Sequence, residues 1–136
     1  MDMAKYRQVF LEEATDHLAE MSRALLELEK DSAGADAIDV LFRMAHSIKG
    51  MAASLEYDSI TEVAHRLEDR MQEIRSAGGV QGSESLALLF RGLERLERMV
   101  AVVRETGEPP PSDPELEETL GAPLDPAQAE GAQKKR

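Results

Sequence analysis

The chain has 136 residues and a formal net charge of −11, and it contains neither cysteine nor tryptophan. This length suits a single domain, and the lack of cysteine excludes disulfides, thiolate metal sites and a cysteine nucleophile. The acidic balance argues against nucleic acid as a partner, because such binding depends on Lys and Arg. No segment is apolar enough for a membrane span or a secretion signal, so we expect a cytoplasmic protein without direct membrane insertion.

The prolines divide the chain into two parts of different character. All six of them follow Thr106, in a segment that is acidic and poor in large apolar groups. We therefore expect a helical domain at residues 1–106 and a Pro-rich, acidic, disordered linker or tail at 107–136, with room for a short extra C-terminal helix. Residues 1–106 are rich in good helix formers and contain no proline to interrupt them.

The first two expected helices span about residues 4–30 and 36–55. In each, apolar residues recur at intervals of three and four, which places them in one stripe along a helix. The stripes are Phe10, Ala14, Leu18, Met21, Leu25 and Leu28 in the first, and Ile38, Leu41, Phe42, Ala45, Ile48 and Ala52 in the second. A turn at residues 31–34 separates them.

The third helix is expected to start near Asp58 or Ser59, where Ser59 and Glu62 have the spacing of a capping box. Ser83 is a candidate N-cap of the fourth helix. The apolar stripes are Ile60, Val63, Ala64, Leu67, Met71 and Ile74 in the third, and Leu86, Leu89, Phe90, Leu93, Leu96, Val100 and Val103 in the fourth.

Four amphipathic helices with short connections predict an all-α fold, an antiparallel up-down four-helix bundle that buries the four stripes against one another. Leu88, Met99 and Val102 form a second stripe on the last helix. We expect it to be either a docking face or a set of scattered surface residues.

His46 lies at the edge of the apolar stripe of the second helix. A helical side chain leans toward the N-terminus, so the residue that would lean over the ring of His46 is the one at i+4, which is Gly50. Glycine costs a helix about 1 kcal/mol relative to alanine, and here it leaves the ring open to a large reactant. Lys49, on the adjacent row, could meet the negative charge of a phosphoryl group. The alternative interpretation is an ordinary boundary histidine, with Gly50 at a helix crossing.

An imidazole that acts as a nucleophile through one ring nitrogen needs an acceptor for its second N–H, because that hydrogen bond selects the tautomer. Glu68 is at the margin of the third stripe, in line with His65, and can face His46 if the second and third helices are antiparallel neighbours. The alternative is a solvated Glu68 paired with Arg66 or Gln72.

The segment from Ala45 to Ala53 resembles the His-x-x-Lys-Gly-x-(small) signature of histidine phosphotransfer (HPt) domains, particularly the N-terminal phosphotransfer domain of CheA-type chemotaxis kinases. The similarity extends over about residues 5–103. It includes the segments Phe10-Leu11-Glu12-Glu13, Leu25-Leu26-Glu27-Leu28-Glu29 and Ala64-His65-Arg66-Leu67-Glu68-Asp69.

The resemblance implies that His46 accepts a phosphoryl group from ATP, through a separate CheA-type catalytic kinase domain, and passes it to an aspartate of a response-regulator receiver domain. It also implies that Glu68 is hydrogen-bonded to His46. Lys49 and His65 then tune the charge around the site, and Gly50 provides access. The parent protein would be a kinase, and this part of it a phosphoryl carrier. ATP and Mg²⁺ are expected on the kinase domain, with no cofactor or metal bound by this one.

Three other interpretations remain open. The Glu62-x-x-His65 spacing occurs in carboxylate-bridged di-iron bundles, but such a site needs a second copy. A helical adaptor without chemistry and a freestanding HPt relay protein are the other two. The sequence departs from many CheA-type domains at Glu56-Tyr57, where they have glycine before the aromatic residue, and this affects the expected turn between the second and third helices.

Overall fold

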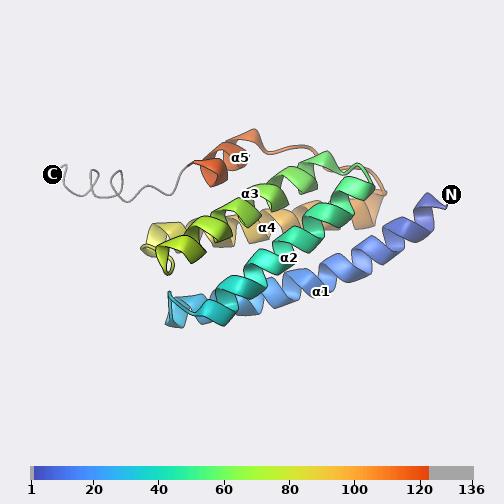
Figure 1. Cartoon of the computed structure of the whole chain (residues 1–136). Helices are drawn as coiled ribbons and strands as arrows, with labels where there is room; N and C mark the ends of the chain where they lie inside the picture. Colours follow the sequence, from blue (N-terminus) through green and yellow to red (C-terminus); the bar gives the residue numbers. More distant parts are fainter. Residues whose placement is uncertain (1, 123–136) are drawn as a thin grey trace.

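The computed structural model describes residues 2–122, which form five α-helices and, within that range, no strand. The helices are α1 (Met3–Lys30), α2 (Ala35–Ser54), α3 (Asp58–Ala77), α4 (Ser83–Thr106) and α5 (Pro114–Gly121). The first four lie side by side, each antiparallel to the one before it (Figure 1). This confirms the expected up-down bundle. The part of the expected tail at residues 123–136 lies outside the described residues.

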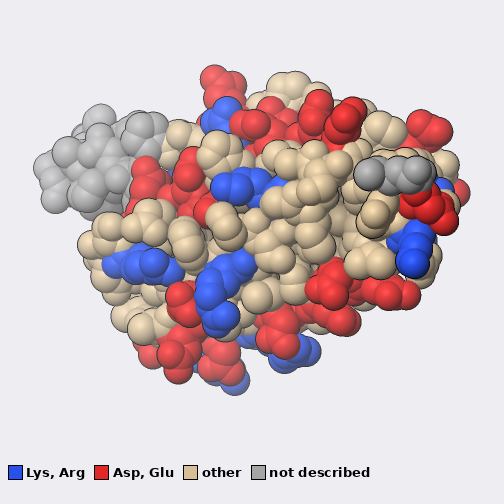
Figure 2. Space-filling model, turned by 45° about the vertical axis from the view of Figure 1, so that its right-hand side comes forward, with Lys and Arg blue, Asp and Glu red and all other residues tan. Residues whose placement is uncertain are grey.

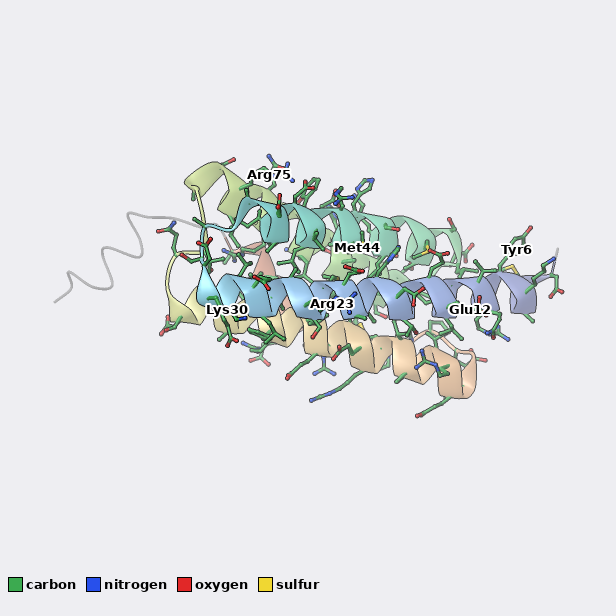
Figure 3. All side chains as sticks on the ribbon, turned by 90° about the horizontal axis from the view of Figure 1, so that it is seen from below. Tyr6, Glu12, Arg23, Lys30, Met44 and Arg75 are labelled. Atoms are coloured by element: carbon green, nitrogen blue, oxygen red, sulfur yellow. The ribbon has the colours of Figure 1, made fainter. Side chains whose placement is uncertain are left out.

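The four long helices close into a ring in which each contacts two others. α1 packs against α2 and α4, and α3 packs against the other sides of the same two helices. Figure 3 shows α1 flanked by α2 on one side and by α4 on the other. α2 and α3 share the most extensive contact in the bundle, and this pair carries the candidate site.

The predicted apolar stripes meet inside this ring. Phe10 is 2% exposed, and its ring lies 5.5 Å from that of Tyr57 at the start of α3. The second stripe of α4 is not an exposed docking face, because Met99 is 3% exposed and Leu88 packs, half-buried, against the core. The third residue of the stripe, Val102, stays partly exposed, and α4 contacts α1, α3 and α5.

Both predicted N-caps are wrong. α3 begins after Tyr57 without a side-chain cap, and the Ser59 hydroxyl donates instead to the carbonyl of Pro110 at 2.7 Å. At α4 the N-cap residue is Gly82, again without a side-chain hydrogen bond, and Ser83 is already helical. The Ser59 hydroxyl thus bonds to a partner distant in the chain, Pro110, which the local sequence around Ser59 does not reveal.

The turn between α2 and α3 has the hydrogen bonds of a Schellman motif. The Tyr57 N–H donates to Ala52 O at 2.9 Å and the Glu56 N–H to Ala53 O at 3.1 Å. Glu56 adopts a left-handed conformation with φ of +62°, the one positive φ of a non-glycine residue in the described range. Glycine adopts this conformation without a steric penalty, so the departure at Glu56 strains the turn but leaves its shape intact.

The chain after α4 does not leave the bundle at Thr106, as the expected linker would. It runs back along α3 and α4 and forms α5, which lies against α3 (Figure 1). Leu116 and Leu120 of α5 are 3% and 1% exposed. Two leucines in a polar segment are enough to bury one face of a short helix, and this converts part of the expected linker into packed structure. No helix within residues 2–122 has both the length and the apolarity needed to cross a bilayer.

Candidate functional site

The α2–α3 contact brings His46 and Glu68 together, as the expected antiparallel arrangement requires. His46 Nδ1 lies 2.7 Å from Glu68 Oε2. The two side chains differ in environment: that of His46 is 64% exposed and that of Glu68 only 11%. A buried carboxylate therefore holds one nitrogen of an imidazole whose ring stands in solvent.

Lys49 completes this cluster from one turn further along α2. Its Nζ lies 2.6 Å from Glu68 Oε1. The two groups form an ion pair. Among the described residues, no donor meets Oε1 with hydrogen-bond geometry. Burial by itself would raise the pKa of Glu68, but the interactions with Lys49 and His46 outweigh it and lower that pKa below its ordinary value. Glu68 is therefore a carboxylate at neutral pH.

The charge of Glu68 determines the tautomer of His46. A carboxylate only accepts hydrogen bonds, so in the neutral ring the proton is on Nδ1 and the lone pair is on Nε2. No described residue forms a hydrogen bond with Nε2. This nitrogen is a free nucleophile on an exposed ring.

Gly50, one turn after His46, borders open space. A Cβ built on Gly50 would meet no atom within 4 Å. A glycine at a helix crossing point is needed where a second helix comes too close for a side chain. No atom of another helix lies that close to Gly50. The interpretation of Gly50 as a helix crossing point is therefore wrong.

His65 is not joined to the cluster by a hydrogen bond or an ion pair. Its Nε2 lies 3.4 Å from Asp69 Oδ2, and the side chain is 48% exposed on the outer surface of α3. No hydrogen bond or ion pair joins it to His46, Lys49 or Glu68. The alternative pairing of Glu68 with Arg66 is also absent, because Arg66 Nε donates to Glu62 at 2.6 Å.

The di-iron interpretation finds no support in the geometry. Within residues 2–122, no group of three or more His, Asp or Glu side chains could hold a metal ion. Glu62 is paired with Arg66 rather than with His65. A metal site at the Glu62-x-x-His65 spacing would need both side chains to be turned toward a common centre.

Charge is unevenly distributed over the surface. Figure 2 shows acidic side chains along the upper and lower borders of one face, with a mostly uncharged band between them that basic groups interrupt. The net charge of −11 is thus compatible with basic groups at single positions on this face.

Two contacts made by residues close in the chain to His46 and Glu68 had no signal in the sequence. His17 Nε2 on α1 lies 2.9 Å from Ser47 Oγ, next to His46 on α2. Arg70, two residues after Glu68, is 5% exposed and donates to carbonyl groups of the segment that ends α5. Both contacts join residues that are far apart in the chain, so no local pattern could have predicted them.

Residues 5–120 match the Hpt domain family. The chain belongs to the Hpt domain family. The match includes α5, in agreement with the packing of that helix against α3.

Several curated relatives are named as chemotaxis proteins. The sequence is 36% identical over 108 residues to "Chemotaxis protein CheA" of Bacillus subtilis (strain 168), covering 79% of this chain and 16% of that protein. It is 30% identical over 106 residues to the protein of the same name from Halobacterium salinarum, covering 78% of this chain and 16% of the relative. The chain thus spans about one sixth of the length of these relatives.

A solved structure shares the fold. It is described as the crystal structure of the phosphorylated P1 domain of CheA3 in complex with CheY6 from R. sphaeroides. The TM-score is 0.73 with 22% sequence identity, and the alignment covers 85% of this chain and 92% of that one.

Proposed function

We propose that this Hpt domain is a phosphoryl carrier in which Nε2 of His46 is the phosphorylated atom. The phosphoryl group comes from ATP bound to a CheA-type catalytic kinase domain and goes to an aspartate of a response-regulator receiver domain. The parent protein is then a histidine kinase of the chemotaxis type, and the domain works in the cytoplasm. The observation that carries the proposal is an exposed imidazole with Nδ1 held by buried Glu68 and Nε2 free.

The chemistry divides into two displacements. In the first, Nε2 attacks the γ-phosphorus of ATP; the N–P bond forms as the bond from phosphorus to the ADP oxygen breaks. The ring becomes cationic because it retains its Nδ1 proton, and the Glu68 carboxylate stabilises this charge at hydrogen-bond distance. In the second, an aspartate oxygen of the receiver attacks phosphorus and the N–P bond breaks, returning the lone pair to Nε2.

The domain contributes position and charge to these steps rather than a catalytic base. Phosphoryl transfer needs in-line access and neutralisation of the phosphoryl oxygens. Gly50 keeps the approach to the ring open, and Lys49, paired with Glu68, is close enough along α2 to meet the incoming phosphoryl group. His65 has a more distant role through the charge of the outer surface of α3. ATP and Mg²⁺ belong to the kinase domain in this scheme, and the carrier itself binds no cofactor.

The proposal is tested by phosphorylation with labelled ATP and a CheA-type catalytic core. We expect acid-labile, base-stable label on the wild-type chain and none on His46→Gln. The other two histidines of the chain serve as internal comparisons. His17→Gln should be labelled as fast as the wild type, because His17 bonds to Ser47 and not to the site, whereas His65→Gln should retain label at a modestly altered rate.

Transfer is tested by adding a receiver protein to the purified phosphorylated domain. Loss of label from the domain and its appearance on the receiver aspartate supports the carrier function. Label that persists on His46→Gln assigns the phosphoryl group to another residue. Absence of label with several active kinase cores supports the helical adaptor instead. A freestanding relay would be labelled by a phosphorylated receiver but not by a kinase core.

A further inference from the structure

Residues 107–122 are fastened to the bundle by more than their two leucines. Asp113 caps α5 by accepting from Leu116 N–H at 3.2 Å and also pairs with Arg95 of α4 at 2.8 Å. Ser59 of α3 donates to Pro110. An eight-residue helix is not stable by itself in water, so α5 exists because these contacts hold it.

Arg70 of α3 makes the densest of these contacts. Its Nη2 donates to the carbonyls of Thr119, Leu120 and Ala122, at 3.2, 3.1 and 2.8 Å. The last carbonyls of a helix lack intrahelical partners, and the negative end of the helix dipole attracts a cation there. Arg70 therefore closes the C-terminal end of α5 from a side chain that is 5% exposed.

Arg70 and Glu68 project from opposite flanks of α3. A separation of two residues corresponds to a rotation of about 200° around a helix. Glu68 faces α2, where it bonds to His46, and Arg70 faces α5. α3 is consequently held from both sides, by α2 on one and by α5 on the other.

This arrangement limits rotation of α3 about its axis. A side-chain tip lies about 5 Å from the helix axis, so a roll of about 10° moves it by about 1 Å. The contact between His46 Nδ1 and Glu68 Oε2 is 2.7 Å long, and such a displacement would take it out of hydrogen-bond range. A roll of α3 by this amount would therefore disturb the site.

We propose that Arg70 is a positioning residue for the His46–Glu68 pair: it ties α5 to α3 and thereby holds Glu68 at hydrogen-bond distance from His46. The inference rests on the proposed function for its consequence in phosphoryl transfer, but not for its geometry. Residues 107–122 then have a role in the site although none of them touches it.

The test uses the full chain with Arg70→Met and Arg70→Lys. Two readouts are needed: amide hydrogen exchange of residues 116–120, which reports α5 docking, and the ¹⁵N shifts of the neutral His46 ring, which report its tautomer. We expect Arg70→Met to speed exchange in α5 more than tenfold and to shift His46 from the Nδ1–H toward the Nε2–H tautomer. Arg70→Lys should restore part of both, because an ammonium can also donate to carbonyls.

Leu25→Ala is the control for a general loss of stability. Leu25 is 1% exposed on α1, a helix whose backbone packs against α2 and α4 but not against α3 or α5. The variant should melt earlier but keep the wild-type tautomer of His46 and the protection of α5.

Two results would overturn the proposal. One is α5 that stays protected in Arg70→Met; the other is α5 that is released while the His46 tautomer remains that of the wild type. If Arg70→Met does not fold, the same readouts on Arg70→Lys decide. Neither readout requires a kinase, so failure of wild-type labelling would contradict the carrier function alone.

Discussion

The two flanks of α3 bury side chains of opposite charge, and the two charges have different roles. On the α2 flank, Glu68 is paired with two side chains, and one of them, His46, is mostly exposed. On the α5 flank, the Nη2 group of Arg70 bonds only to backbone carbonyls. The buried charge of Glu68 has a partner that can react, so it belongs to the candidate site. The buried charge of Arg70 has backbone partners, so it forms a structural attachment, or joint, between α3 and α5.

The largest effect is expected for Glu68→Gln on the site flank. The amide can still accept from Nδ1–H, but it cannot stabilise the cationic ring, so the rate of phosphoryl uptake should fall by about 10²-fold. Initial rates of labelling measure this. Glu62→Gln is the matched control, since Glu62 lies on the same helix and pairs only with Arg66. If Glu68→Gln were labelled at a rate within about threefold of wild type, the charge of Glu68 would not contribute to phosphoryl uptake, and the α2 flank would be structural like the α5 flank.

Leu120→Ala tests the joint flank. Leu120 is 1% exposed, and its truncation should lower the free energy of unfolding by about 2–3 kcal/mol. Urea denaturation measures the loss, and faster amide exchange confined to α5 would show that the joint opens locally. An unchanged denaturation midpoint together with unchanged exchange would mean that α5 contributes nothing to the fold.

Gly50→Leu probes the open side of the site. A leucine in this position fills the approach to the His46 ring, and transfer should slow by on the order of tenfold because the reacting atoms cannot align. Gly50→Ala is the control. Its Cβ meets no atom, so transfer should persist while the helix gains about 1 kcal/mol of stability. Equal transfer rates in both variants would show that the space is not used.

Glu56→Gly concerns the turn that joins the two helices of the site. Glu56 has φ of +62°, and glycine should relieve about 1 kcal/mol of strain without altering the hydrogen bonds of the turn. Chemical denaturation should show the gain, with labelling of His46 unchanged. A loss of stability would mean that the Glu56 side chain contributes more than its backbone costs.

The smallest effect is expected in acid. The pKa of Glu68 is lowered in the folded protein from the ordinary value of 4.5, so its ionised form stabilises the fold at pH values above 4.5. That contribution is lost as the pH falls from about 4.5 through the folded-state pKa. The difference in unfolding free energy between the wild type and Glu68→Gln should therefore shrink over this acidic range. A constant difference from pH 7 to pH 3 would contradict it.

Much of the fold could be predicted from local patterns. The apolar stripes located all four long helices to within a few residues, because the helical period of 3.6 residues shows directly in the spacing of apolar residues along the chain. The expected capping box at Ser59 failed because the hydroxyl found Pro110, 51 positions away in the chain. Of the second stripe of α4, Met99 is buried and Leu88 packs against the core, while Val102 stays partly exposed, because burial depends on how the helices pack and not on the spacing of apolar residues alone.

The sequence by itself determined which residues share the reactive segment of α2. His46, Lys49 and Gly50 are three and four positions apart, and helix geometry alone makes them neighbours. Tertiary structure decided the rest: that Glu68 reaches His46 across the α2–α3 contact, that His65 does not, and that Arg70 fastens α5 on the opposite flank. The physical reason is that Arg70 bonds to backbone carbonyl groups, which every residue carries. The side chains of α5 therefore give no sequence signal for this contact.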